Sequence, residues 1–263
     1  MKMLKIFNIV MVAIIGFMAT IIILSFLYNQ PPPPSYRRAL IIDTVGTRFP
    51  NKDLINYTKT ILESYGYKVD IVHGRDATVE FFRNNLTKYE VIIMRVHSTI
   101  LRVSFQLLPN GTVGIITGER YNKSKYVSEQ LNEMLIPSNL FVEVGAGAGY
   151  FTITPLFIRA LKGNFNNTVI IVMGCHSLYT ESMADAFIEK GAKAYIGWSD
   201  YVTVDFMDQA LKKLIQYLFE KRMSIDEAVK SVWRELGVDP AYLAKLDYYP
   251  KGAGSYVIPG KKK

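Results

Sequence analysis

Cysteine occurs once in the 263 residues of this chain, as Cys175. A single thiol cannot close an internal disulfide, which excludes a small domain stapled by disulfides. Three roles remain open for Cys175: a buried structural side chain, half of an intermolecular bridge, or a reactive thiol. Histidine is scarce too, with only His73, His97 and His176. These side chains are too scattered for the spacing of a metal site, and we expect no cofactor.

Acidic residues are absent from the first 36 positions and from the last three. The net charge of +8 comes from 31 basic and 23 acidic residues, and five of the basic ones are the lysines of these two terminal segments. Residues 37–260 therefore carry 26 basic and 23 acidic side chains and are nearly neutral. A nucleic-acid footprint needs cations clustered on one face or stripe. The sequence has no such run, so no nucleic-acid partner is predicted.

Charge is also absent from residues 6–28, IFNIVMVAIIGFMATIIILSFLY. At about 1.5 Å per residue, a helix of this length crosses the roughly 30 Å hydrocarbon core of a bilayer. A cleaved signal peptide is the alternative, but its apolar segment is usually about 7 to 15 residues long. No small-residue cleavage site precedes the prolines that follow. We therefore expect residues 1–28 to form an uncleaved, single-pass membrane anchor.

The basic residues that flank this segment favour neither orientation in the membrane, since Lys2 and Lys5 precede it and Arg37 and Arg38 follow it. The short N-terminal tail favours a cytoplasmic N-terminus and an extracytoplasmic C-terminal domain. Asn-x-Ser/Thr sequons agree with export and lie at Asn56, Asn85, Asn110, Asn122 and Asn166.

Four consecutive prolines, Pro31–Pro34, predict a stiff polyproline II spacer over residues 29–36. Apolar strand patterns and helical patterns alternate through residues 37–263. Strands are predicted at 39–45, 69–74, 91–98, 111–119, 169–175 and 194–198. Helices are predicted at 54–66, near 78–86 and 125–135, at 183–191, and near 205–221 and 225–236. Continuous Val/Ile runs between helices are typical of a parallel sheet covered on both faces, so we expect one three-layer α/β domain with a mostly parallel central sheet.

The two most apolar of these strands are VIIMRVHS (91–98) and VIIVMGCHS (169–177), and each ends in a polar residue that can do chemistry. Ligands of open α/β sheets bind at the carboxyl ends of the strands. If the two strands are parallel neighbours, His97 and Cys175 share one edge of the sheet. An imidazole beside a thiol can take its proton and lower its pKa, which is the composition of a cysteine hydrolase dyad.

The order of these segments resembles the caspase-like fold of the clan CD cysteine peptidases. The resemblance covers a strand ending in His97, a long excursion, a strand ending in Gly174–Cys175, and ESMADAFIEKGAKAYIGWSDYV (181–202). The last segment is similar to the CHAT and gingipain branches. The resemblance implies a peptide or protein substrate, His97 as general base and acid, Cys175 as nucleophile, and oxyanion donors among the backbone amides near Ser98 and Gly174. The family usually has glycine directly after this histidine, where this chain has Ser98.

Specificity in such enzymes comes from a pocket beside the nucleophile. Trp198, Asp200 and Asp205 follow the strand after Cys175 and are expected near its rim, where the carboxylates would favour a basic residue before the scissile bond. His176, beside Cys175, is a second candidate base, although adjacent side chains generally point apart. His73 ends the second strand and is expected to be peripheral.

Two other functions stay open. FVEVGAGAGYF (141–151) resembles motif I of S-adenosylmethionine methyltransferases, but the acidic residue expected about 20 residues later is replaced by Met173, Gly174 and Cys175. The second of these functions is that of a catalytically inactive binding module on the caspase-like fold. Together these patterns favour a membrane-tethered cysteine hydrolase, with the inactive module as the main alternative.

Overall fold

The computed structural model describes residues 16, 18, 37–101, 106–138 and 149–260. Apart from residues 16 and 18, the expected anchor (1–28) and spacer (29–36) lie outside the described residues. No described helix is long and apolar enough to cross a bilayer. Contacts divide the chain into two compact units, Met1–Tyr36 and Arg37–Lys263, and all the strands lie in the second unit.

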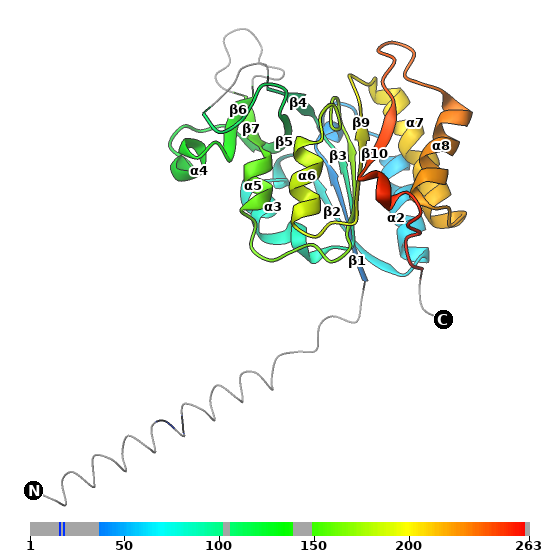
Figure 1. The fold of residues 1–263 in the computed structure, drawn as a ribbon, viewed down its shortest axis with the longest axis horizontal. Helices are drawn as coiled ribbons and strands as arrows, with labels where there is room; N and C mark the ends of the chain where they lie inside the picture. The colour runs from blue at the N-terminus through cyan, green and yellow to red at the C-terminus, as the bar shows by residue number, and fades with distance from the viewer. Residues whose placement is uncertain (1–15, 17, 19–36, 102–105, 139–148, 261–263) are drawn as a thin grey trace, which may run out of the picture. The chain divides into compact units, whose positions relative to one another are not determined.

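A mixed sheet of six strands forms the centre of this unit (Figure 1). Its strands, in spatial order, are β2 (Tyr67–His73), β1 (Arg37–Asp43), β3 (Val91–Arg95), β8 (Val169–Met173), β9 (Ala194–Trp198) and β10 (Leu246–Tyr249). Neighbouring strands pair in parallel except β9 and β10, which are antiparallel. The predicted α/β class with a mostly parallel sheet is confirmed.

Helices cover both faces of this sheet because alternate residues of each central strand are apolar on opposite sides. In β3, Ile93 packs in a core shared with α2 (Lys52–Ser64), α7 (Val204–Ile215) and α8 (Ile225–Leu236). Ile92 packs on the other face, in a core shared with α3 (Val79–Asn85), α5 (Pro155–Arg159) and α6 (Ser182–Glu189). Short 3-10 helices lie at η1 (Val45–Thr47), η2 (Gly74–Asp76), η3 (Leu86–Lys88) and η5 (Lys251–Ala253), and the π-helical segment η4 (Gln216–Glu220) directly follows α7.

A second, antiparallel sheet lies in the excursion between β3 and β8. Its strands, in spatial order, are β4 (Ser98–Ile100), β5 (Val113–Arg120), β7 (Tyr150–Ile153) and β6 (Leu135–Ser138). The sequence predicted β5 alone. The helix expected near 125–135 shortens to α4 (Val127–Leu131), because Glu133 has a positive φ of 54° and its carboxylate accepts backbone N–H groups of residues 106–108. Most of the glycine motif at 141–151 lies outside the described residues.

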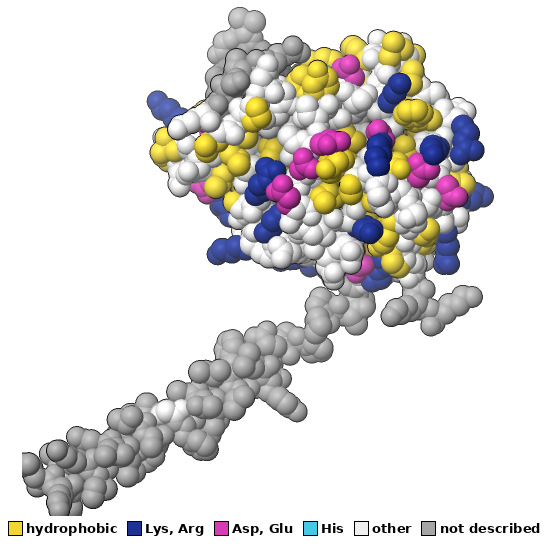
Figure 2. Space-filling model, viewed as in Figure 1, with side chains coloured by type: hydrophobic (Ala, Val, Ile, Leu, Met, Phe, Trp, Pro, Cys, Tyr) yellow, Lys and Arg dark blue, Asp and Glu magenta, His cyan; other side chains and the backbone are white. Residues whose placement is uncertain are grey.

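The surface of the domain carries both signs of charge. Figure 2 shows Lys and Arg side chains interspersed with Asp and Glu over one face, above the helices that cover the sheet. This mixture agrees with the near-neutral charge of residues 37–260.

Candidate active site

The strands that precede His97 and Cys175 are parallel neighbours, as the sequence predicted. Their register runs from Val91 opposite Val169 to Arg95 opposite Met173, and the ladder continues with Val96 N–H donating to Met173 O at 3.0 Å. His97 and Cys175 both follow two residues after the last pair. They therefore occupy matching positions at the same edge of the sheet.

Cys175 is a free, half-buried thiol. It packs against the core on the side of α2, α7 and α8, and its Sγ lies 3.6 Å from the carbonyl oxygen of Val202. Burial raises the pKa of this thiol, and the nearby carboxylates of Asp239 and Asp200 add to the rise. The lowered pKa that we expected from a neighbouring base is therefore wrong for this structure, because desolvation disfavours the thiolate. The raised pKa favours the thiol form of Cys175 over a preformed thiolate.

His97 is half-buried beside a cavity of about 260 Å³. Burial, together with the positive charges of Arg95 and Arg48, lowers the pKa of its imidazole to about 4. The ring is neutral at physiological pH, which is the form that accepts a proton.

The lowered pKa of His97 predicts acid sensitivity. The unfolded chain binds a proton at this site from pH 6.5 downward, whereas the folded chain resists it until about pH 4. The stability that depends on neutral His97 is therefore complete above pH 6.5 and is lost as the pH falls towards 4. We expect a loss of about 2–3 kcal/mol, measured by urea unfolding, that is absent in His97→Gln. Identical pH profiles for the two proteins would contradict this placement of His97.

Ser98 and Gly174 bring the two strand ends into contact. Ser98 Oγ donates to the carbonyl oxygen of Cys175 at 2.5 Å. Because Ile116 N–H donates to His97 O, residues 97 and 116 form a hydrogen-bonded pair of the second sheet, and the amide of Ser98 points away from β5. β4 is an edge strand, so this amide is directed off the sheet. To donate to an oxyanion, the Ser98 amide must face Cys175. Its position agrees with this, because a Cβ added to Gly174, the neighbour of Cys175, would lie 3.3 Å from Ser98 N.

Gly174 is predicted to be intolerant of a side chain. An added Cβ would lie 2.5 Å from Ser98 Oγ and 2.6 Å from the backbone oxygen of Val96, and backbone cannot move aside cheaply. We expect Gly174→Ala to lower the free energy of unfolding by about 1–3 kcal/mol. The matched control is Gly252→Ala, because no atom lies within 4 Å of a Cβ there. Equal chemical denaturation midpoints for the two variants would show that the strand ends are not packed as described.

The structure does not bring the three expected pocket residues together. Trp198 is 1% exposed and lies in the core, where its indole N–H contacts Met173 Sδ at 3.3 Å, so its expected place at a rim is wrong. The reason is strand alternation, which points Trp198 inward with Ile196. Asp205 is exposed on α7 and lines a cavity with Asp208.

Asp200 is coupled to His176. Their side chains approach to 3.2 Å between Nε2 and Oδ1, and His176 N–H donates to Asp200 O. His176 is 4% exposed, has a positive φ of 58°, and packs edge-on against Tyr201 with 4.0 Å between ring centroids. These contacts hold the loop after β8 against the loop after β9.

Arg95 was not singled out in the sequence and is the most heavily bonded side chain near the site. It is fully buried, and its guanidinium donates to both carboxylate oxygens of Asp208 at 2.7 and 2.8 Å, to Asp43 at 2.9 Å and to Phe49 O at 3.0 Å. Asn51 also donates to Asp208 at 2.8 Å. The signal in the sequence was a charged residue inside the apolar run VIIMRV, since such a residue requires buried partners.

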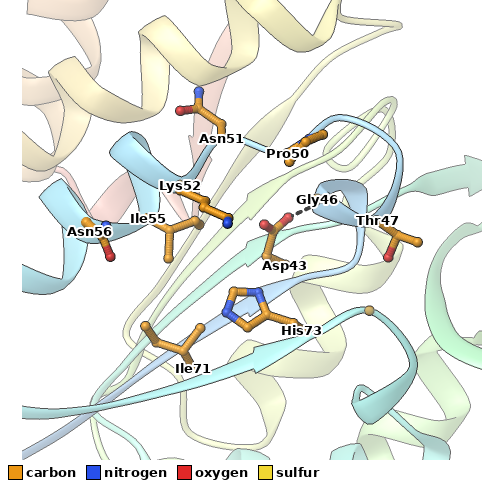
Figure 3. Close-up of a pocket in the computed structure, with 11 residues that line it drawn as sticks. Asp43, Gly46, Thr47, Pro50, Asn51, Lys52, Ile55, Asn56, Ile71 and His73 are labelled. Carbon is orange, nitrogen blue, oxygen red and sulfur yellow. Dashed lines mark hydrogen bonds between the residues drawn. The ribbon is translucent and has the colours of Figure 1, made fainter.

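A second cavity, of about 460 Å³, opens at the carboxyl ends of β1 and β2 (Figure 3). Asp43, Asn51, Lys52 and His73 are among its lining side chains, and Asp43 accepts a hydrogen bond from Gly46 N–H at 2.7 Å. His73, expected to be peripheral, is exposed on this cavity.

Metal ligation finds no support in the part of the chain that the structure describes, where no group of three or more His, Cys, Asp or Glu side chains is arranged to hold an ion. No protein-family model matches the sequence, and no curated protein sequence does so either. The function must therefore be inferred from the site itself.

Proposed function

We propose that this protein is a cysteine hydrolase of the caspase-like type that cleaves peptide bonds with Cys175 and His97. The observation that carries the proposal is the pairing of β3 with β8, which sets the two side chains at matching positions on one edge of the sheet. Ligands of such sheets bind at this edge.

The chemistry follows from two neutral groups. Sγ of Cys175 attacks the scissile carbonyl carbon while its proton passes to the imidazole of His97, and the carbonyl electrons move to oxygen. The C–N bond then breaks, the leaving amine takes the proton from His97, and a thioester remains. Water activated by His97 hydrolyses the thioester and restores the thiol. Because burial raises the thiol pKa, proton transfer accompanies attack and does not precede it.

Backbone amides complete the proposed site. The amides of Ser98 and Cys175 flank the contact between the two strand ends and are the candidate donors to the oxyanion. Ser98 stands where the family usually has glycine. Its hydroxyl donates a hydrogen bond to the carbonyl oxygen of Cys175, which fixes the Ser98 side chain against the backbone of Cys175.

The test is a peptide library cleaved by the full-length chain in detergent under reducing conditions, with and without calcium. We expect at least one peptide to be cut by the wild type and left intact by Cys175→Ala. The variant should keep its melting temperature, because it loses one side-chain atom. Cleavage that persists in Cys175→Ala would exclude the thiol as nucleophile.

An inactive binding module on the same fold is the second candidate. The raised pKa of Cys175 and the lowered pKa of His97 both favour it, since each opposes formation of the thiolate–imidazolium pair. A library that is bound but never cut would support this alternative.

We also propose that residues 6–28 tether the protein to a membrane with the domain outside the cytoplasm. The uncharged sequence of this segment supports the proposal. Protease added to intact cells should digest the domain. Protection in intact cells that is lost on lysis would place the domain in the cytoplasm.

A further inference from the structure

The first and last described segments of the domain meet at one edge of the central sheet. Arg37 opens β1, and its guanidinium donates to the carbonyl oxygen of Pro259. Tyr65, shortly before β2, donates through its hydroxyl to Ile258 O at 2.8 Å. Because β1 and β2 are parallel, both begin at this edge, which is opposite the edge of the candidate active site. Figure 1 shows the start of β1 and the last described segment at the lower end of the domain.

Basic side chains outnumber the carboxylates that could neutralise them at this edge. Within the described part of the chain, no salt bridge involves Lys193, Lys221 or Arg222. Lys193 directly precedes β9, and the other two directly follow η4. Glu90, at the same edge, is already paired with Arg37. Exposed Glu220, which ends η4, therefore stands against three cations.

The sequence adds more positive charge at the same place. A Cβ added to Gly260 would lie 3.1 Å from Nη2 of Arg222, so the described chain ends beside this exposed guanidinium. Lys261–Lys263 follow directly in the sequence. We call Lys193, Lys221, Arg222 and Lys261–Lys263 the basic edge.

Apolar and aromatic side chains lie among these cations. Val257 is 44% exposed, and Nζ of Lys193 lies 5.2 Å from the centroid of the Tyr256 ring. Tyrosine and lysine both combine an apolar body with a polar tip, which suits the boundary between lipid headgroups and acyl chains. Cations flanking an exposed valine are likewise typical of surfaces that bind anionic lipid.

We propose that the basic edge docks the domain onto an anionic membrane surface, with its side chains on lipid phosphates and Val257 at the acyl boundary. The proposal rests on the proposed tether of residues 6–28 and is independent of the hydrolase. Residues 29–36 span at most about 30 Å when fully extended, so the edge at which Arg37 enters the domain stays within reach of the bilayer. Docking by this edge turns the opposite one, with Cys175, towards soluble substrates.

The experiment follows the approach of this edge to the lipid surface. The full-length chain, as Cys175→Ala, carries a donor fluorophore at Ser255→Cys and is reconstituted into vesicles with acceptor-labelled headgroups. We expect energy transfer to rise when phosphatidylglycerol is added to phosphatidylcholine. It should fall back in about 1 M salt, where the Debye length is about 3 Å. A donor at Asn110→Cys should respond much less, because Asn110 is exposed beside Gly111, whose carbonyl contacts the loop after β8 at the far edge.

Removal of single cations provides the second measurement. Lys193→Gln and Arg222→Gln should each lower the ratio of docked to undocked protein in anionic vesicles about fivefold, as expected for one basic residue near a lipid surface. Lys193→Arg and Arg222→Lys keep the charge and should restore docking, which separates a loss of charge from a loss of folding. Lys245→Gln is the matched control, because Lys245 also lies over a ring, at 5.7 Å from that of Trp233, but precedes β10 at the opposite edge.

The docking edge and the tether fail differently. Equal energy transfer in neutral and anionic vesicles, or a rise that persists when the whole basic edge is changed to glutamine, would overturn the docking edge. Flotation with phosphatidylcholine vesicles in about 1 M salt tests the tether, because screened cations contribute little there. A chain that floats but does not approach anionic lipid keeps the tether and loses the docking edge. A chain that does not float loses both.

Discussion

His97→Gln is expected to lower kcat/KM for a cleaved peptide by about 10²–10⁴-fold, the range that a general base contributes. Glutamine matches the size and polarity of the imidazole but cannot carry a proton between the thiol of Cys175 and the leaving amine. The change should fall mainly on kcat, since proton transfer belongs to the transition state and not to substrate binding. Steady-state kinetics near pH 7 provide the measurement.

Stability serves as the control for that experiment. His97 is neutral at this pH in both folded and unfolded chains, so His97→Gln should unfold at nearly the wild-type urea concentration. His176→Gln tests the rival base. A larger loss of kcat in His176→Gln than in His97→Gln would move the role of base to His176.

Arg95→Met is expected to lower the free energy of unfolding by about 3–5 kcal/mol. Arg95 is fully buried, and its removal leaves the carboxylates of Asp43 and Asp208 in the core without their cation. The same substitution frees Phe49 O and the segment 44–50, which carries Arg48. Chemical denaturation gives the free energy.

A surface pair supplies the matched control for Arg95. Arg159 bonds Glu189 through Nε at 2.6 Å, but both side chains are well exposed. Arg159→Met should therefore cost no more than about 1 kcal/mol. A similar small cost for Arg95→Met would mean that the Arg95 network is solvated, contrary to its burial.

The sequence was sufficient to predict the centre of the fold and the parallel pairing of the two strands that precede His97 and Cys175. VIIMRV and VIIVMG are runs that are apolar except for Arg95, as is typical of strands buried on both faces, and the polar residues that follow them mark one sheet edge. The second sheet was not predicted because β4, β6 and β7 are strands of three or four residues without clear alternation of apolar and polar residues. Periodicity over so few residues does not distinguish a strand from a loop.

Side-chain partners were harder to predict than strands. Nothing local in the sequence links Arg95 to Asp208, which lies 113 residues later. The same holds for the cavity beside His97, whose lining combines the turns after β1 and β2 with residues of the second sheet. Trp198 shows the converse, since a residue that was expected beside the nucleophile points into the core through strand alternation.

The most direct test of the Cys175–His97 pair is labelling by a peptidyl acyloxymethyl ketone, which a catalytic thiol attacks with loss of the carboxylate. The ketones tested carry a basic, an acidic or an uncharged side chain next to the reactive group, and intact-mass spectrometry follows the full-length chain. We expect one adduct, located on Cys175, that forms at least about tenfold more slowly in His97→Gln. An adduct that forms equally fast in His97→Gln, or no adduct on Cys175 at any concentration, would contradict it.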